Sequence, residues 1–67
     1  MPSVFKNCYS LTNDSLNNIL SMCASATKIN SSNRTLNYIG LTQNQANICK
    51  NLSNYSTFTA AGWTTGY

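Results

Sequence analysis

Few residues in this chain could carry out chemistry. The 67-residue sequence has no histidine, and Asp14 is its single carboxylate. General acid–base catalysis needs a side chain that titrates near the working pH, which leaves Asp14, the cysteines, the tyrosines and the lysines as candidates. Asp14 is better explained as a first-turn helix residue, where a negative charge favours the positive end of the helix dipole. The sequence therefore predicts a protein that is not an enzyme.

The three cysteines do not form a motif. Cys8, Cys23 and Cys49 have no C-x-x-C spacing, so a zinc site is not expected, and no histidine is present to activate a cysteine nucleophile. Cys23 and Cys49 fall on apolar helical positions, where a thiol behaves as a small buried hydrophobe. A disulfide between two of the three, with one thiol left over, is the alternative in an exported protein.

Charge and glycine spacing argue against two further classes of partner. The net charge is +3, but the cations are scattered along the chain, which does not favour nucleic-acid binding. The glycines are too widely spaced to form a phosphate-binding loop. We expect no cofactor, no metal and no small-molecule substrate. The cations are Lys6, Lys28, Arg34 and Lys50.

Aromatic residues are the best candidates for a contact surface. A tyrosine supplies a large contact area with a polar tip at low entropic cost. Tyr9, Tyr55 and Tyr67 are predicted interface residues. Tyr38 and Trp63 are interpreted instead as core or helix-end residues. The partner that this predicts is another protein.

The elements that would position these side chains are mostly helices in one small domain. Apolar residues recur at helical spacing after Thr12, which predicts a helix over 12–27 with Asp14 at its start and Lys28 near its end. An Asn- and Ser-rich loop should follow over 28–34. Closely spaced apolar residues over 35–41, with Gly40 at a bend or close backbone approach, predict one short strand.

The second half of the chain is predicted to be helical. Thr42 and Gln45 have the spacing of a capping box and should begin a helix over 42–53. A short helix over 54–61 should end at Gly62, with Trp63 contacting Phe58 in a Schellman motif. The expected fold is mixed α+β and mainly helical, and a small all-α bundle is the alternative. The predicted core includes Val4, Phe5, a set of Leu and Ile residues, Phe58 and Trp63.

An internal repeat gives the one family resemblance. Ser10-Leu11-Thr12 before the first helix returns thirty residues later as Gly40-Leu41-Thr42 before the second, and Asn17 matches Asn47. Leu36-x-x-Ile39-x-Leu41-x-x-Asn44 fits the leucine-rich-repeat line. Phe5-x-Asn7-Cys8-x-Ser10-Leu11 resembles an element of BspA-type leucine-rich repeats. The runs 14–20, 36–41, 52–55 and 61–67 together resemble the C-terminal end of such arrays in gut Firmicutes and their phages.

The resemblance implies structure and binding rather than catalysis. It implies a last repeat plus C-terminal cap of a bacterial or phage surface or tail protein, acting in adhesion or host recognition, and it requires a strand within 35–41 flanked by helices. Because repeats bury their faces against neighbours, homo-oligomerisation through the exposed repeat face, a compact bundle and a longer context are alternatives. The rival function is a stand-alone phage or mobile-element inhibitor of the anti-CRISPR or antitoxin type. A third alternative is a truncated relative without a function of its own.

The sequence does not decide the compartment. Its start lacks the apolar stretch of a secretory signal, and no window is long enough for a membrane span, so we expect a soluble protein. A stand-alone inhibitor would be cytoplasmic, and part of a longer protein would be at the cell surface or on a virion.

Overall fold

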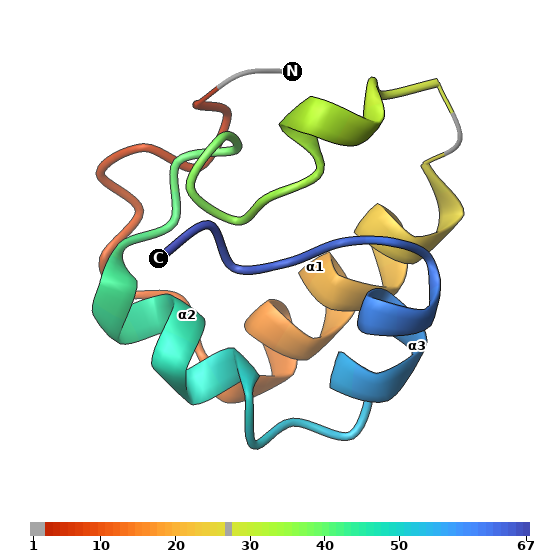
Figure 1. Cartoon of the computed structure of the whole chain (residues 1–67). Coiled ribbons are helices and arrows are strands. Elements are labelled where there is room, and N and C mark those ends of the chain that lie inside the picture. Colours follow the sequence, from red (N-terminus) through yellow and green to blue (C-terminus); the bar gives the residue numbers. More distant parts are fainter. Residues whose placement is uncertain (1–2, 27) are drawn as a thin grey trace.

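Short helices make up most of the regular structure. The computed structural model describes residues 3–26 and 28–67. Its elements are α1 (Asn13–Ser25), a 3-10 turn (Ser31–Asn33), α2 (Gln43–Cys49) and α3 (Tyr55–Ala60), arranged as in Figure 1. The mainly helical fold is confirmed, and the absence of a strand in the described residues fits the all-α alternative.

The limits of α1 follow from its sequence. Thr12 is the N-cap, and its side chain accepts a hydrogen bond from the Ser15 backbone N–H at 3.1 Å, which satisfies one of the free amides of the first turn. Asp14 lies in that turn, as predicted. Ala26 ends the helix in an extended conformation. The prediction extended to Thr27, which lies outside the described residues, and the expected basic residue is absent from the last turn.

The start of α2 confirms the capping box. The Thr42 hydroxyl accepts from the Gln45 N–H at 3.1 Å, and the Gln45 side chain accepts from the Thr42 N–H at 2.9 Å. The predicted end at residue 53 is wrong, because α2 ends at Cys49 and residues 50–54 form turns. The turn at 50–54 is bonded to α1, because Asn54 donates its backbone N–H to the side chain of Asn17.

The end of α3 is the predicted Schellman motif. The Gly62 N–H bonds the Thr59 carbonyl at 3.0 Å, and the Trp63 N–H bonds the Phe58 carbonyl at 3.4 Å. Gly62 has φ +90°, the left-handed conformation that this motif needs. The rings of Phe58 and Trp63 lie with centroids 5.7 Å apart, so the aromatic pair closes the helix end as expected.

The strand predicted over 35–41 is wrong. Residues 36–40 form turns, and Thr35 makes one isolated parallel bridge with Thr64. The reason lies in the spacing: Leu36, Ile39 and Leu41 are all buried, and side chains three residues apart point to opposite faces of a strand. Turned backbone is what brings these three side chains to the same core.

Three chain segments nevertheless lie side by side. On one flank of 35–39, the amides of Ser3 and Phe5 bond the carbonyls of Tyr38 and Ile39 at 2.7 and 2.8 Å. On the other flank, the amides of 36 and 37 bond the carbonyls of 64 and 65, each at 3.1 Å. The last segment crosses the molecule beside this loop (Figure 1). Gly40 allows the approach, because a Cβ there would lie 2.6 Å from the Lys6 nitrogen.

Arg34 holds the loop between α1 and residues 35–39 in place. The loop predicted over 28–34 is present, with the 3-10 turn inside it. The Arg34 guanidinium donates to the carbonyls of Ile29 at 3.0 Å and Ala61 at 3.1 Å. The second acceptor lies at the end of α3, so a cation meets the negative end of that helix.

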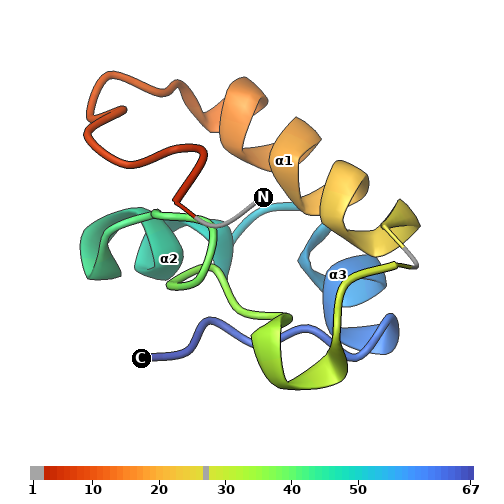
Figure 2. The ribbon, with the colours of Figure 1, turned by 90° about the horizontal axis from the view of Figure 1, so that it is seen from above.

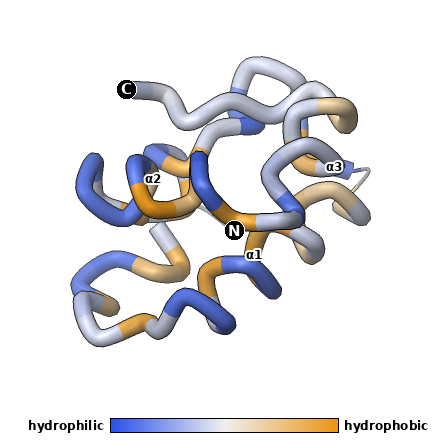
Figure 3. The backbone as a smooth tube through the Cα atoms, turned by 90° about the horizontal axis from the view of Figure 1, so that it is seen from below, coloured by the Kyte–Doolittle hydropathy of each residue, from blue (hydrophilic) through white to orange (hydrophobic). Residues whose placement is uncertain are grey.

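The core lies where α1 faces α2 and α3 (Figure 2). Apolar and polar residues alternate along the helices in Figure 3, as expected for helices that bury one side. Val4 was predicted in the core, but it is exposed, and Phe5 is half-buried against the core. The fully packed residues are Leu16, Ile19, Leu20, Cys23, Leu36, Ile39, Leu41, Ala46, Cys49, Phe58 and Trp63.

Candidate contact surface around α2

The residues that could carry out chemistry do not come together in a reactive site. Cys23 and Cys49 are fully buried free thiols, and burial raises the pKa of each to about 11. At neutral pH both are therefore protonated and poor nucleophiles. Asp14 is exposed on α1. The part of the chain that the structure describes contains no pocket and no cluster of side chains that could hold a metal ion.

The most distinctive surface is the outer side of α2. Gln45, Ala46 and Cys49 are buried, which fixes the inward side of the helix. The helical period then places the other side chains outward over a wide arc, with Asn47 near its centre. The exposed residues of this helix and its C-cap are Gln43, Asn44, Asn47, Ile48 and Lys50.

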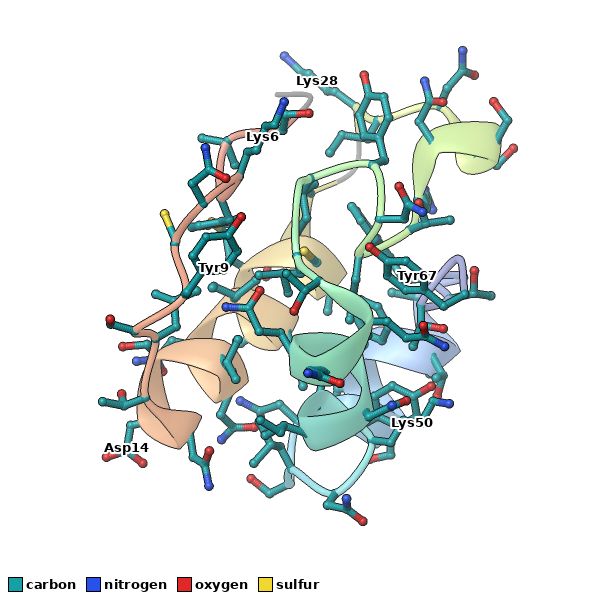
Figure 4. All side chains as sticks on the ribbon, turned by 90° about the vertical axis from the view of Figure 1, so that its left-hand side faces the viewer. Lys6, Tyr9, Asp14, Lys28, Lys50 and Tyr67 are labelled. Atoms are coloured by element: carbon teal, nitrogen blue, oxygen red, sulfur yellow. The ribbon has the colours of Figure 1, made fainter. Side chains whose placement is uncertain are left out.

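Two of the three predicted interface tyrosines flank this helix. Figure 4 shows Tyr9 on one side of α2 and Tyr67 on the other. Their side chains are 69% and 53% exposed. We call the exposed side of α2, together with Tyr9 and Tyr67, the α2 face.

Both tyrosines are held by local hydrogen bonds. The Tyr9 hydroxyl donates to Asn7 Oδ1 at 2.6 Å. The Tyr67 hydroxyl donates to the Leu41 carbonyl at 2.6 Å, immediately before the α2 N-cap. Because each hydroxyl has a hydrogen-bond partner within the chain, each ring should lose less conformational entropy when a partner covers it.

Tyr55 has a different setting. It is half-buried on α3, and its ring stacks on Phe58 with the centroids 5.5 Å apart. Much of its apolar area is therefore already used inside the molecule. Tyr38 also packs half-buried against the core and Trp63 is buried, in agreement with their interpretation as core or helix-end residues.

The Gln45 side chain connects α2 to the segment that contains Tyr9. Its side-chain Nε2 donates to the Cys8 carbonyl at 2.6 Å while its Oε1 completes the capping box. Only 7% of this residue is exposed. The capping-box spacing identified Gln45 but gave no sign of the second contact, because its partner is 37 residues away.

Charge on the α2 face comes from Lys50. Lys6, Lys28 and Asp14 lie away from Lys50, with Asp14 on the opposite side of the molecule in Figure 4. Most of the α2 face is neutral and polar, so binding there would rely on shape, aromatic contacts and amide hydrogen bonds.

Length and hydropathy rule out a bilayer-spanning role for each helix among the described residues.

Asn47, Ile48 and Lys50 were not predicted as surface candidates from the sequence, although the helical period of α2 could have placed them on one side. Comparison of the chain with protein-family models, with curated proteins and with solved structures finds no match.

Proposed function

We propose that this chain is a noncatalytic protein-interaction module and that the α2 face is its contact surface. The observation that carries the proposal is the pair of exposed tyrosines, Tyr9 and Tyr67, on the two sides of a helix whose outer side is left uncovered by residues 3–26 and 28–67. Tyrosine is enriched among residues that dominate binding energy at interfaces. Burial of the Cys23 and Cys49 thiols and the lack of a pocket in the described residues also support binding over catalysis.

The narrower version is a C-terminal cap resembling BspA-type leucine-rich repeats. It required a strand within 35–41, and the described residues form only a single bridge there, which weighs against it. In its favour, the segments 3–5, 35–39 and 64–65 lie side by side in chain order and about thirty residues apart, as successive turns of a solenoid would. We therefore keep the general interaction module as the main proposal.

Substitutions on the α2 face test the proposal. The wild-type chain, a Tyr9→Ser/Ile48→Ser variant and a Met22→Ser control are immobilised and compared for retained proteins. Met22 is 41% exposed like Ile48, but it lies on α1. We expect proteins that the wild type and the control both retain to be at least about tenfold depleted on the α2-face variant. Equal retention by all three chains would contradict the proposal.

The second candidate is a stand-alone inhibitor that occludes a larger enzyme. The observation in its favour is that one chain encloses the core, with Leu16, Leu36 and Phe58 each at 0% exposure. Size exclusion with light scattering and a melt under reducing conditions separates the two. A cooperative monomer favours the inhibitor, to be tested by adding the protein to candidate enzymes, whereas an oligomer or an unfolded chain favours a cap that needs neighbours.

A further inference from the structure

The helices α1 and α2 begin with the same local geometry. Their N-caps, Thr12 and Thr42, have φ/ψ of −76°/166° and −75°/165°. Each threonine side chain accepts the amide three residues further on. Asn17 and Asn47 each lie five residues after the cap, so they occupy equivalent positions on two helices of the same start.

Asn17 shows what an asparagine at this position can bind. Its Oδ1 accepts the Asn54 backbone N–H at 2.9 Å, its Nδ2 donates to Ser53 Oγ at 3.1 Å, and its backbone carbonyl accepts from Asn54 Nδ2 at 3.1 Å. All of these partners belong to the turn that leads into α3. The asparagine therefore clasps the start of another helix.

This clasp replaces a local cap. Asn54 is the N-cap residue of α3, yet its side chain makes no capping hydrogen bond. Amides at a helix start have no partner within their own helix, and here the acceptor for the Asn54 amide comes from Asn17 on a neighbouring helix. Within this chain, therefore, a side chain of one helix supplies the capping acceptor at the start of another helix.

Asn47 presents the same group outward. It is exposed near the centre of the outer side of α2. Its carbonyl accepts from Asn51 Nδ2 at 3.4 Å, and its side-chain amide has no hydrogen-bond partner within residues 3–26 and 28–67. Both functional atoms of the side chain, Oδ1 and Nδ2, are available to a second molecule.

The neighbouring position specifies the charge of the occupant. Leu20 and Lys50 are equivalent in the two helices, each three residues after the asparagine; Leu20 is fully buried, whereas Lys50 is exposed. A segment seated on Asn47 would therefore lie against a cation. Helix starts favour Asp and Glu in their first turn, which matches Lys50 in sign.

We propose that the α2 face binds the N-terminus of a partner protein's helix that carries a carboxylate in its first turn. Asn47 Oδ1 accepts a free amide of that helix, as Asn17 does for α3, and the carboxylate lies at Lys50. This inference rests on the proposed function and identifies the chemistry of the partner. Tyr9 and Tyr67 flank these two contacts, and the rest of the α2 face is neutral.

A peptide titration followed by NMR tests this inference. The probe is an N-acetylated, alanine-based helical peptide beginning Ser-Asn-Glu, and its matched control has the Glu moved to the last turn. We expect saturable shifts of the Asn47 side-chain amide and of the Ile48 and Lys50 backbone amides with the first peptide. Binding should weaken about fivefold in Asn47→Ala and about threefold in Lys50→Gln. Asn18→Ala, at an exposed asparagine of α1, should bind as the wild type does.

Three outcomes would overturn the inference: no saturable shift on α2 up to millimolar peptide, equal binding of both peptides, or unchanged affinity in Asn47→Ala. Asn47 and Lys50 are exposed, so neither substitution should disturb the fold. A dispersed NMR spectrum of each variant will check that the fold is intact. Failure here while Tyr9→Ser/Ile48→Ser still loses retained proteins would remove only the identity of the partner. Loss of neither would remove the proposed function itself.

Discussion

The surroundings of α1 and α2 differ although the two helices start alike. The outer position at Asn17 is covered by the turn before α3, with hydrogen bonds of 2.9 to 3.1 Å. The equivalent position at Asn47 is exposed. A repeated sequence therefore encodes the same helix start twice, but burial depends on what the rest of the chain places across it.

The difference also separates stability from binding. Around α1, buried apolar side chains and the Asn17 clasp hold α3 in place, so substitutions there should mainly change the free energy of unfolding. Around the outer side of α2, side chains are solvated in the free protein, so substitutions should change binding and leave folding nearly unaltered. The following measurements can break this division.

The largest effect is expected from Phe58→Ala. Phe58 is fully buried and contacts the rings of Tyr55 and Trp63, and truncating a buried aromatic residue costs about 3 to 5 kcal/mol. Such a loss approaches the whole stability of a small domain. Ile48→Ala on the α2 face should cost less than about 1 kcal/mol, because Ile48 is 41% exposed. Urea unfolding followed by circular dichroism measures both, and similar midpoints would refute the division.

Gly40→Ala should be the next most damaging change. Its backbone has φ +101°, and a Cβ would lie 2.6 Å from the Lys6 backbone nitrogen, so the first segment would have to move away from 35–39. We expect a loss of at least about 2 kcal/mol from strain and overpacking together. Gly62→Ala is the matched control, because its φ is +90° but the nearest atom to a Cβ is 3.7 Å away. It should cost only about 1 kcal/mol.

Asn17→Ala and Asn47→Ala compare the two helices directly. Removing the Asn17 side chain leaves the Asn54 amide without its acceptor, which should cost about 1 to 2 kcal/mol. Asn47→Ala should change stability by less than about 0.5 kcal/mol. Hydrogen exchange provides the site-specific measurement: protection at Asn54 should fall in the first variant and persist in the second. Equal effects would mean that the clasp does not hold α3.

Local signals in the sequence predicted the helix starts and one helix end well. Thr12, the Thr42 capping box and the Phe58–Trp63 closure at Gly62 all depend on residues within six positions of one another, and each was confirmed. The end of α2 and the strand over 35–41 were predicted wrongly. The turn after α2 is bonded to Asn17, and residues 35–39 are bonded to the segments at 3–5 and 64–65, all far away in the chain. The spacing of Leu36, Ile39 and Leu41 was the one local sign against a strand.

The candidate contact surface was predictable only in part. Composition identified Tyr9 and Tyr67, and the structure places them on the two sides of α2. Tyr55 was chosen by the same rule and lies half-buried on Phe58, because residue type alone does not tell an exposed ring from a packed one. The importance of Asn47 arises from comparison with Asn17, whose contacts with Ser53 and Asn54 are tertiary and have no sequence signature.

The smallest effect at neutral pH is expected from the two buried thiols on the inner sides of α1 and α2. Burial raises the pKa of Cys23 on α1 and of Cys49 on α2 from 9.0 to about 11, and a neighbouring Cys49 charge adds to the shift of Cys23. Unfolded chains therefore release these protons at lower pH than the folded protein does. Stability should be constant up to about pH 8 and fall between about pH 8 and about pH 11, on the order of 1 kcal/mol per thiol by pH 10. Denaturant unfolding in reducing buffer from pH 7 to 10.5 measures it. Cys49→Ala should have a lower baseline but about half the slope. An unchanged slope in Cys49→Ala would show that the inner side of α2 is solvated, and the two helices would then differ on both of their sides.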